Sequence, residues 1–448
     1  MNIKNITHRI FAIALMALIG IGGFAQMPAE IEPIKAPFAM PELKRPTFPE
    51  RSISIVKTGA KQTKVNTAAI QKAIDKMAKK GGGTVIIPEG SWQTGRIILK
   101  SNVNLHLEKN AVVHLTGVIN DYLPVVQARY EGVDAFSLGG MIYANGAENI
   151  AITGSGKFVG PSYKCEILSR TEGGVSPQLE NTPLEQRIVD GSDGKRIFMP
   201  AFFGAFNCRN VLVEGVTFEH SLFWNIVPTY CENVIIRGVT VNSHGHVRTD
   251  GIDIDSSVNV LIEYSTLSCG DDCFTLKAGR GNDGMNRNCP TENVVIRHCT
   301  VKRGVGGFAV GSETAATIRN VYVHDCVVEN AMYPFYMKTR RPRGGGGENM
   351  LFERIHVKNS ERPAIFFDML GSPNSVGGLG QRLPEREVNR LTPAFRNFTF
   401  RDITIDKCPM MLRAKGLPES PIENLTLENI KSANRQMSVQ DIGTMIIK

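Results

Sequence analysis

The chain has 448 residues, a formal net charge of +8 at pH 7 and 42% hydrophobic residues. That length suffices for several domains or for one long solenoid. The charged residues are mixed along the chain, and no helix-turn-helix, finger or RNP pattern is present, so we expect no nucleic-acid partner. The excess of positive charge fits ordinary surface charge, and an acidic polymer as the partner is the alternative.

The N-terminus carries the pattern of a secretory signal peptide. Lys4 and Arg9 precede an apolar run over residues 10–24, and small residues follow up to Ala25. We therefore expect residues 1–25 to be a signal peptide cleaved near Ala25, and the mature protein to be periplasmic or secreted. The run is too short for a membrane span, and no other stretch is long and apolar enough to be one.

Residues 26–52 are rich in proline and predict a linker, which leaves residues 53–448 as the folded domain. Residues 66–77 place Ala69, Ile70, Ala73, Ile74 and Met77 on one helical face, and three glycines after residue 80 end this helix. Short strands are expected next, at residues 84–88, 95–99, 103–107 and 111–115.

From residue 149 onward the chain repeats one pattern: asparagine, then apolar residues at the first, third, sixth and eighth following positions. Most repeats are about two dozen residues long and hold three short strands, which predicts an all-β fold, a parallel β-helix with residues 66–77 as an N-terminal capping helix. Longer repeats indicate loops inserted near residues 279–290 and 371–393. The pattern begins at Asn210, Asn233, Asn259, Asn293, Asn320, Asn349, Asn397 and Asn424.

The repeat also places most of the nine cysteines. Core thiols that stack from coil to coil are expected at Cys208, Cys231, Cys299 and Cys326. Cys273 and Cys289 are candidates for a disulfide that closes the loop between them, and an odd total leaves at least one thiol free. No cysteine pair has the spacing and histidine partners of a zinc site.

The third strands of four successive repeats carry the residues of chemical interest. Their inward apolar pairs align as Ile252/Ile254, Phe274/Leu276, Phe308/Val310 and Phe335/Met337. This register stacks Asp250 on Asp272, about 4.8 Å apart, with Asp271 beside them. Clustered carboxylates raise one another's cost of ionisation, which separates acid and base roles. Asp253 and Asp255 fit turn or cap residues equally well.

Two lysines and a basic loop adjoin the carboxylates. The register places Lys277 and Lys338 on neighbouring positions of the same face, and Arg340 belongs to a glycine-rich basic loop that follows Lys338. This loop is suited to grip an anionic polymer, or else forms a solvated face. Lys277 alternatively serves only to neutralise the carboxylates.

These motifs resemble the polygalacturonase (pectinase) family of glycoside hydrolases, family 28, from about residue 54 to the C-terminus. The segments that carry the resemblance are Thr249-Asp250-Gly251-Ile252-Asp253, Gly270-Asp271-Asp272-Cys273, Gly306-Gly307-Phe308, Gly311-Ser312-Glu313 and Lys338. The resemblance implies a right-handed parallel β-helix that hydrolyses pectin, an acidic plant polysaccharide, with no metal and no cofactor. We expect the protein to act as a monomer.

The resemblance also implies the catalytic roles. Asp271 is the expected general acid toward the leaving oxygen, and Asp250 and Asp272 activate water for inversion at the sugar carbon. Inverting enzymes usually hold acid and base about 6.5–9.5 Å apart, and we expect this separation here. Candidate substrate-binding residues are Lys338, Tyr336, Lys277, Arg248 and Arg340.

Three positions depart from the family pattern. The family usually has Gly-His-Gly where this chain has Val305 between two glycines, and the apolar side chain should raise the pKa of Asp271 by desolvation. The family usually has arginine where Tyr336 stands, and tyrosine offers a sugar face instead of a bidentate carboxylate contact. Arg248 replaces an asparagine and is expected to supply a cation from another direction. His244 and His246 are expected to be loop residues.

These departures leave other interpretations open. A relative that accepts rhamnogalacturonan or a branched galacturonan fits them within the same family. A calcium-dependent pectate lyase-like enzyme would use the three aspartates as calcium ligands and Lys277 or an arginine as base. A non-catalytic glycan-binding solenoid is the third alternative, against which the intact aspartate trio argues.

Overall fold

The computed structural model describes residues 27–448, except residues 172–173, 176 and 373–375. The expected signal peptide lies outside these residues. The chain divides into two compact units, Met1–Glu32 and Pro33–Lys448, and the fold below is that of the second unit. No helix within the described residues is long and apolar enough to cross a membrane.

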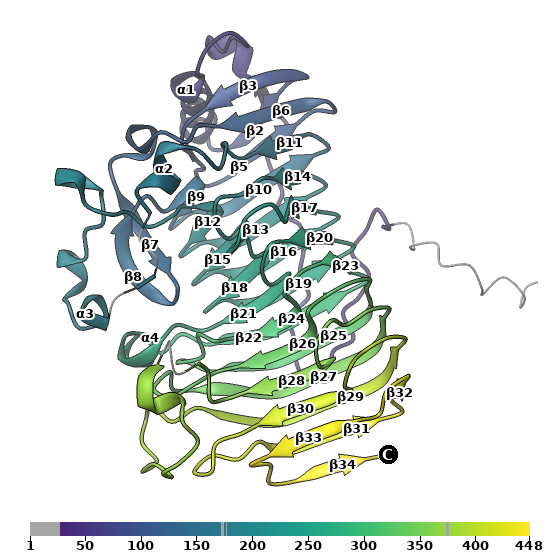
Figure 1. Ribbon diagram of the computed structural model, residues 1–448. Coiled ribbons are helices and arrows are strands. Elements are labelled where there is room, and N and C mark those ends of the chain that lie inside the picture. Colours follow the sequence, from purple (N-terminus) through teal and green to yellow (C-terminus); the bar gives the residue numbers. More distant parts are fainter. Residues whose placement is uncertain (1–26, 172–173, 176, 373–375) are drawn as a thin grey trace, which may run out of the picture. The chain divides into compact units, whose positions relative to one another are not determined.

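The second unit is a right-handed parallel β-helix, as the sequence predicted (Figure 1). Each coil contributes short strands that pair in parallel with the coils before and after it. One sheet of 11 strands, counted over the described residues, carries the candidate site. Its strands are β4 (Ile97–Ile98), β9 (Gly140–Asn145), β12 (Ala201–Phe206), β15 (Ile226–Thr229), β18 (Ile252–Asp255), β21 (Phe274–Lys277), β24 (Gly306–Val310), β26 (Tyr333–Lys338), β28 (Ile365–Asp368), β30 (Leu412–Lys415) and β33 (Met437–Gln440).

The remaining parallel strands form the other faces of the coils. One row consists of β1 (Ser52–Ser54), β2 (Gly83–Ile87), β5 (Val103–Leu107), β10 (Glu148–Gly154), β13 (Arg209–Glu214), β16 (Glu232–Arg237), β19 (Val258–Glu263), β22 (Thr291–Arg297), β25 (Ile318–Val328), β27 (Gly346–Val357), β29 (Ala394–Ile405), β31 (Glu423–Glu428) and β34 (Met445–Ile447). The second row consists of β3 (Gly90–Thr94), β6 (Ala111–Leu115), β11 (Lys157–Val159), β14 (Thr217–Glu219), β17 (Thr240–Ser243), β20 (Thr266–Cys269), β23 (Thr300–Arg303) and β32 (Lys431–Ser432), and the long strands β25, β27 and β29 continue it.

The template asparagines explain why the coils repeat. Asn293 adopts a left-handed backbone conformation, φ 57°, which asparagine tolerates better than most residues. Its side-chain amide donates to Asn259 (3.2 Å) and its side-chain oxygen accepts from Asn320 (3.1 Å). The same link joins each template asparagine from 210 to 424, so one ladder of side-chain hydrogen bonds follows the coils.

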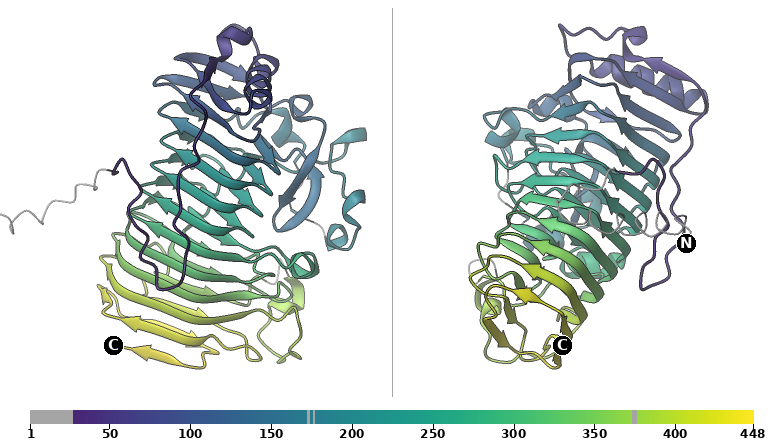
Figure 2. Two further views of the ribbon diagram at one scale, coloured as in Figure 1. Left: turned by 180° about the vertical axis from the view of Figure 1, so that it is seen from behind. Right: turned by 90° about the vertical axis from the view of Figure 1, so that its right-hand side faces the viewer.

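The ends of the β-helix also follow the sequence. The predicted capping helix is α1 (Thr67–Lys79), which buries Ile70, Ala73, Ile74 and Met77 against the first coil. It lies at one end of the coil stack (Figure 1). Strand β3 was not predicted, because its sequence shows no apolar alternation. Residues 33–49, predicted as a linker, run along the outside of the coils (Figure 2), and Arg45 bonds Glu214 at 2.9 Å.

The cysteine predictions are partly wrong. The four expected core thiols are buried, and the amide of Cys299 lies 3.5 Å from the sulfur of Cys326 in the next coil. The disulfide between Cys273 and Cys289 does not form. Cys273 is buried, with its sulfur directed at the carbonyl of Arg303 (3.2 Å), while Cys289 lies on the inserted loop and contacts the carbonyl of Arg287.

Candidate active site

The predicted register of the third strands is confirmed. Ile252 pairs with Phe274, Phe274 with Phe308, and Phe308 with Phe335, so a row of stacked side chains fills the core behind the site. The rings of Phe274 and Phe308 lie 5.4 Å apart. The pairing continues into the residues before these strands, where the amide of Gly251 donates to the carbonyl of Asp272 at 2.9 Å. This bond holds the aspartate segments of the two coils side by side.

The structure brings the three candidate catalytic aspartates together. Asp250, Asp271 and Asp272 each place a carboxylate oxygen within 4.8 Å of the other two. The expected separation of 6.5–9.5 Å is therefore wrong for the nearest oxygens. Two such oxygens can share one water, because a water with two O–H···O bonds of about 2.7 Å bridges up to about 5.5 Å. The cluster is thus suited to hold a water between carboxylates.

Burial makes this cluster reluctant to ionise. Desolvation, followed by the charges of Asp253 and Asp271, raises the pKa of Asp250 well above its usual range. Desolvation and the charge of Asp272 likewise raise the pKa of Asp271, in the direction predicted from Val305. The amide of Val305 bonds the carbonyl of Asp271 at 2.9 Å, so the apolar residue is its neighbour on the next coil. A raised pKa keeps a general acid protonated.

Lys338 and Lys277 supply the compensating charge. The ammonium of Lys338 donates to Asp272 Oδ2 at 2.6 Å. Asp272 Oδ1 has no hydrogen-bond partner among the described residues, and a Cβ added to Gly306 would clash with it. The glycine therefore leaves space beside this oxygen. Lys277 lies 3.7 Å from Asp250 and 3.5 Å from Asp253.

Asp253 and Asp255 are both buried strand residues and not turn residues. Asp253 faces Lys277, and desolvation raises its pKa to about 8. Asp255 accepts from Arg129 at 2.8 Å and from the amide of Gly279 at 3.2 Å. Asp255 thus belongs to an anchoring cluster and not to the cluster of Asp250, Asp271 and Asp272.

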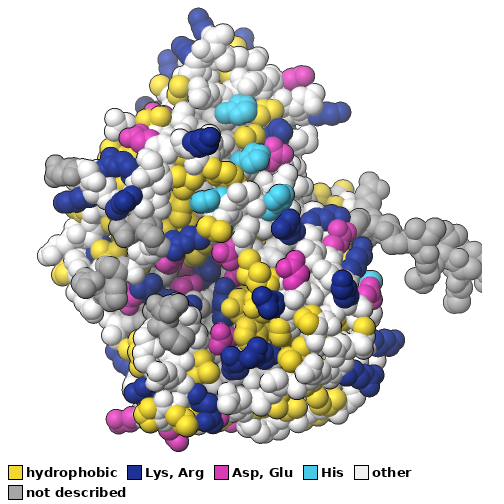
Figure 3. Space-filling model, in the orientation of Figure 1, with side chains coloured by type: hydrophobic (Ala, Val, Ile, Leu, Met, Phe, Trp, Pro, Cys, Tyr) yellow, Lys and Arg dark blue, Asp and Glu magenta, His cyan; other side chains and the backbone are white. Residues whose placement is uncertain are grey.

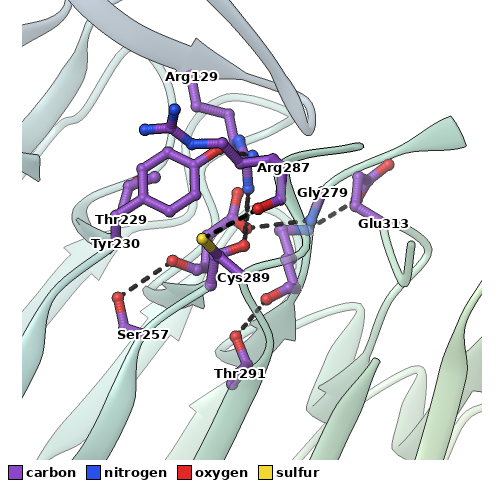
Figure 4. Close-up of polar contacts among 12 residues, drawn as sticks. Arg129, Thr229, Tyr230, Ser257, Gly279, Arg287, Cys289, Thr291 and Glu313 are labelled. Carbon is purple, nitrogen blue, oxygen red and sulfur yellow. Dashed lines mark hydrogen bonds and ion pairs between the residues drawn. The ribbon is translucent and has the colours of Figure 1, made fainter. Parts of the chain in front are cut away.

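That anchor holds the hairpin of β7 (Val126–Tyr130) and β8 (Val133–Ser137) against the coils (Figure 4). Arg129 pairs with Asp134 on the hairpin at 2.8 Å as well as with Asp255, and it lies over the ring of Tyr230, 4.4 Å from the centroid. Arg287, from α4 (Gly281–Arg287), lies over the same ring at 4.6 Å. The hairpin and the inserted loop are therefore held at one place.

Sequence reasoning missed Glu313 as a site residue, although its segment contributed to the resemblance. Glu313 is buried and accepts from Lys277 at 3.4 Å, while the guanidinium of Arg343 lies 3.4 Å from its other oxygen. Burial alone would raise the pKa of Glu313, but Lys277, Arg343 and Arg340 outweigh it and hold that pKa far below its usual range. Glu313 is therefore a permanent anion that fixes Lys277 beside Asp250.

The clustered charges line a cavity of about 730 Å³. Acidic and basic side chains gather in a hollow on this face of the protein (Figure 3). Inserted segments build its walls, with Glu131 from the hairpin, Glu180 from α3 (Pro177–Glu180), Arg280 before α4 and Leu379 from the loop after β28. The coils contribute Trp224, Arg248, Asp250, Asp271, Lys277, Ser312, Glu313, Lys338 and Arg340.

The candidate substrate-binding residues differ in their position. Arg248 and Arg340 line the cavity with the two lysines, and Arg340 donates to Ser312 at 2.7 Å. Tyr336 does not line it. Its ring stacks on Tyr333 (4.6 Å) and Phe366 (5.5 Å), and the ammonium of Lys338 lies 4.6 Å from its centroid.

Comparison with known proteins shows what the chain is similar to. Residues 190–377 match the model of glycosyl hydrolases family 28. The chain is 25% identical to a probable polygalacturonase of Vitis vinifera over 82% of the chain and 70% of the relative. It is 26% identical to an exo-poly-alpha-D-galacturonosidase of Dickeya chrysanthemi, over 79% of the chain and 62% of the relative.

A solved structure shows the same similarity. The chain superposes on a hyperthermoactive exopolygalacturonase from Thermotoga maritima with a TM-score of 0.77 and 28% identity. The match covers 91% of this chain and 94% of the other. It confirms the right-handed parallel β-helix and the membership of the glycoside hydrolases.

Proposed function

We propose that the protein hydrolyses the galacturonan backbone of pectin. The observation that carries this proposal is the cavity in which Asp250 and Asp271, two of the three clustered carboxylates, adjoin several cations. A polyanionic sugar needs cations to bind it and protonated or water-bound carboxylates to cleave it. The named relatives act on such polymers, and their similarity supports the same substrate class here.

In this mechanism Asp271 protonates the leaving oxygen. Its raised pKa keeps the proton available, and its place on the cavity wall exposes it to the glycosidic bond. Asp250 and Asp272 hold the attacking water between them, and Asp272, which pairs with Lys338 at 2.6 Å, accepts the proton of this water. Attack by this water displaces the leaving oxygen that Asp271 protonates and inverts the anomeric carbon.

Substrate carboxylates bind to the cavity cations. Lys338 and Lys277 lie beside the aspartates, and Arg340 and Arg248 lie on the cavity wall. Arg340 lines the cavity and donates to Ser312 at 2.7 Å, so its guanidinium is held at the cavity wall. Arg340 thereby supplies the guanidinium that position 336 lacks. The ring of Tyr336 forms a cation–π contact with the ammonium of Lys338.

A rhamnogalacturonan or branched galacturonan is the second candidate substrate. Val305 beside the acid and the packed ring of Tyr336 favour it, because both remove a polar contact from the substrate side. A calcium-dependent lyase is less well supported. The ammonium of Lys338 already pairs with Asp272, which would have to be a calcium ligand in that enzyme. A solenoid that only binds glycans gains nothing from three acids facing an acidic sugar.

The test uses the mature protein with polygalacturonan and, separately, with rhamnogalacturonan, each with and without chelator. Hydrolysis produces reducing ends without ultraviolet absorbance, whereas a lyase produces absorbance from unsaturated ends. We expect reducing ends alone, unchanged by chelator, and a loss of about 10²–10⁴-fold in kcat for Asp271→Asn. Proton NMR of the first product reports its anomer. Calcium-dependent absorbance, or silence on both backbones, would contradict the proposal.

A further inference from the structure

A second cavity, of about 530 Å³, adjoins the catalytic one. Its lining is largely apolar, with Leu168, Met199 and Val247, and it also contains His246, whose ring stacks on Tyr163 at 5.2 Å. Among the described lining residues, only Arg248 borders both cavities. Arg248 therefore stands between them.

The two cavities follow one another along the coils. The second is lined by the segment after β11, by Met199 just before β12, and by the turn that leads to Asp250. The catalytic cavity continues from Asp250 to later coils, as far as Lys338 and Arg340. Successive coils are stacked at about 4.8 Å, so a sugar chain lying along the stack would run from one cavity into the other.

Arg248 is held in the boundary by the hairpin. Its guanidinium lies 3.2 Å from the carboxylate of Glu131, at the tip between β7 and β8, and donates to the hydroxyl of Tyr130 at 3.4 Å. The ring of Tyr130 stacks on Phe198 at 4.3 Å and on Phe223 at 4.6 Å. Since Arg129 anchors the same hairpin to the coils, the Arg248–Glu131 pair is a rigid element.

We propose that the Arg248–Glu131 pair is the end wall of the substrate cleft and makes the enzyme exo-acting. This inference rests on the proposed function. Arg248 attracts the carboxylate of the terminal sugar, whereas Glu131 repels the carboxylate of any sugar that would follow it. The wall also blocks the path to the second cavity, so cleavage releases a short product from the chain end. Glu131 is the specificity-determining residue, because it closes the cleft without contacting the reacting atoms.

The test is the product length and the viscosity of polygalacturonan during digestion. The wild-type protein should release mono- or disaccharide from the start, with little loss of viscosity for each reducing end formed. Glu131→Ala opens the wall, and we expect longer oligomers among the first products and a several-fold greater loss of viscosity for each reducing end. Glu131→Gln keeps the side-chain volume but removes the charge that repels a following carboxylate, so it should also lengthen the first products, by less than Glu131→Ala.

Glu329→Ala is the matched control, because Glu329 forms a surface ion pair with Lys302 at 2.8 Å and does not line the cavity. Melting temperatures establish that all variants are folded. Long oligomers as the first wild-type products would overturn the inference, as would unchanged product lengths in folded Glu131→Ala, or the same shift in Glu329→Ala. A wild-type protein inactive on every pectic backbone would overturn the proposed function, and this inference with it.

Discussion

Lys338 and Asp272 form an ion pair of 2.6 Å beside the cavity, with the carboxylate buried and the ammonium partly exposed. The charge of the lysine also lowers the pKa of the neighbouring Asp271. The balance between this lysine and the burial of the aspartates sets the acid–base properties of the site.

Replacing Lys338 by methionine removes that charge. Asp272 then becomes a buried carboxylate without its partner, which should cost about 3–5 kcal/mol of stability. Asp271 loses a cation that lowers its pKa, so its pKa rises and the alkaline limb of kcat moves to higher pH. Urea unfolding and a pH profile of kcat measure the two effects. Lys302→Met, on the exposed surface, should change stability by less than about 0.5 kcal/mol. An unmoved limb would contradict the role of Lys338.

Val305→His should move the alkaline limb of the kcat profile to lower pH, opposite to the effect of the Lys338 variant. Histidine replaces an apolar neighbour of Asp271 by a polar group that can hydrogen-bond the carboxylate. The pKa of Asp271 should therefore fall, and the alkaline limb should shift to lower pH. Val305→Leu preserves the apolar contact and serves as the control. A limb that stays in place in the histidine variant would show that Val305 does not influence the acid.

Gly306→Ala tests the space beside Asp272. The new Cβ would lie closer to Asp272 Oδ1 than any tolerated contact, so the carboxylate or the strand must shift. We expect a loss of kcat of at least about 10²-fold, because a displacement of about 1 Å near the reacting atoms costs that much. Steady-state kinetics measure it, with circular dichroism as the control for folding. Full activity in this variant would show that catalysis does not need the space beside Asp272 Oδ1.

Asp253→Asn should reduce the dependence of stability on pH. The pKa of Asp253 is about 8 in the folded protein, against an ordinary value of 3.8, so between these pH values the folded state binds more protons. Wild-type stability should then fall as pH rises through this window, by up to about 1.4 kcal/mol per pH unit for one proton. Urea unfolding at pH 5 and pH 8 should show a smaller fall in the variant. The exposed carboxylate of Glu42 provides the control, Glu42→Gln. Equal falls in all three proteins would refute the prediction.

The asparagine ladder can be separated into two contributions. Asn293→Gly loses two side-chain hydrogen bonds, at about 0.5–1.5 kcal/mol each, but keeps the left-handed backbone without strain. Asn293→Ala loses the same bonds and adds about 1–2 kcal/mol for the left-handed conformation. Chemical denaturation should therefore rank wild type above the glycine variant and the alanine variant last. An alanine variant as stable as the glycine variant would contradict the backbone contribution.

The sequence by itself determined the β-helix and the register of its coils. The asparagine at each left-handed corner and the inward apolar pairs after Asp250 and Asp272 repeat locally, and parallel stacking propagates them from one coil to the next. The same regularity predicts that the three aspartates lie side by side on neighbouring coils. The capping helix followed from its own periodicity.

The tertiary structure alone decided what surrounds that cluster. Asp255 forms an ion pair with Arg129, and Glu313 forms one with Lys277. The ring of Tyr336 lies within an aromatic stack. Strand periodicity predicts none of these contacts. The Arg248–Glu131 pair joins residues 117 positions apart, by subtraction, on an inserted hairpin and a turn. Insertions of this kind do not share the repeat, so their contacts depend on how each loop packs and not on the pattern of the coils. The local repeat therefore specified the aspartate cluster, and long-range loop packing determined the walls of the cavity beside it.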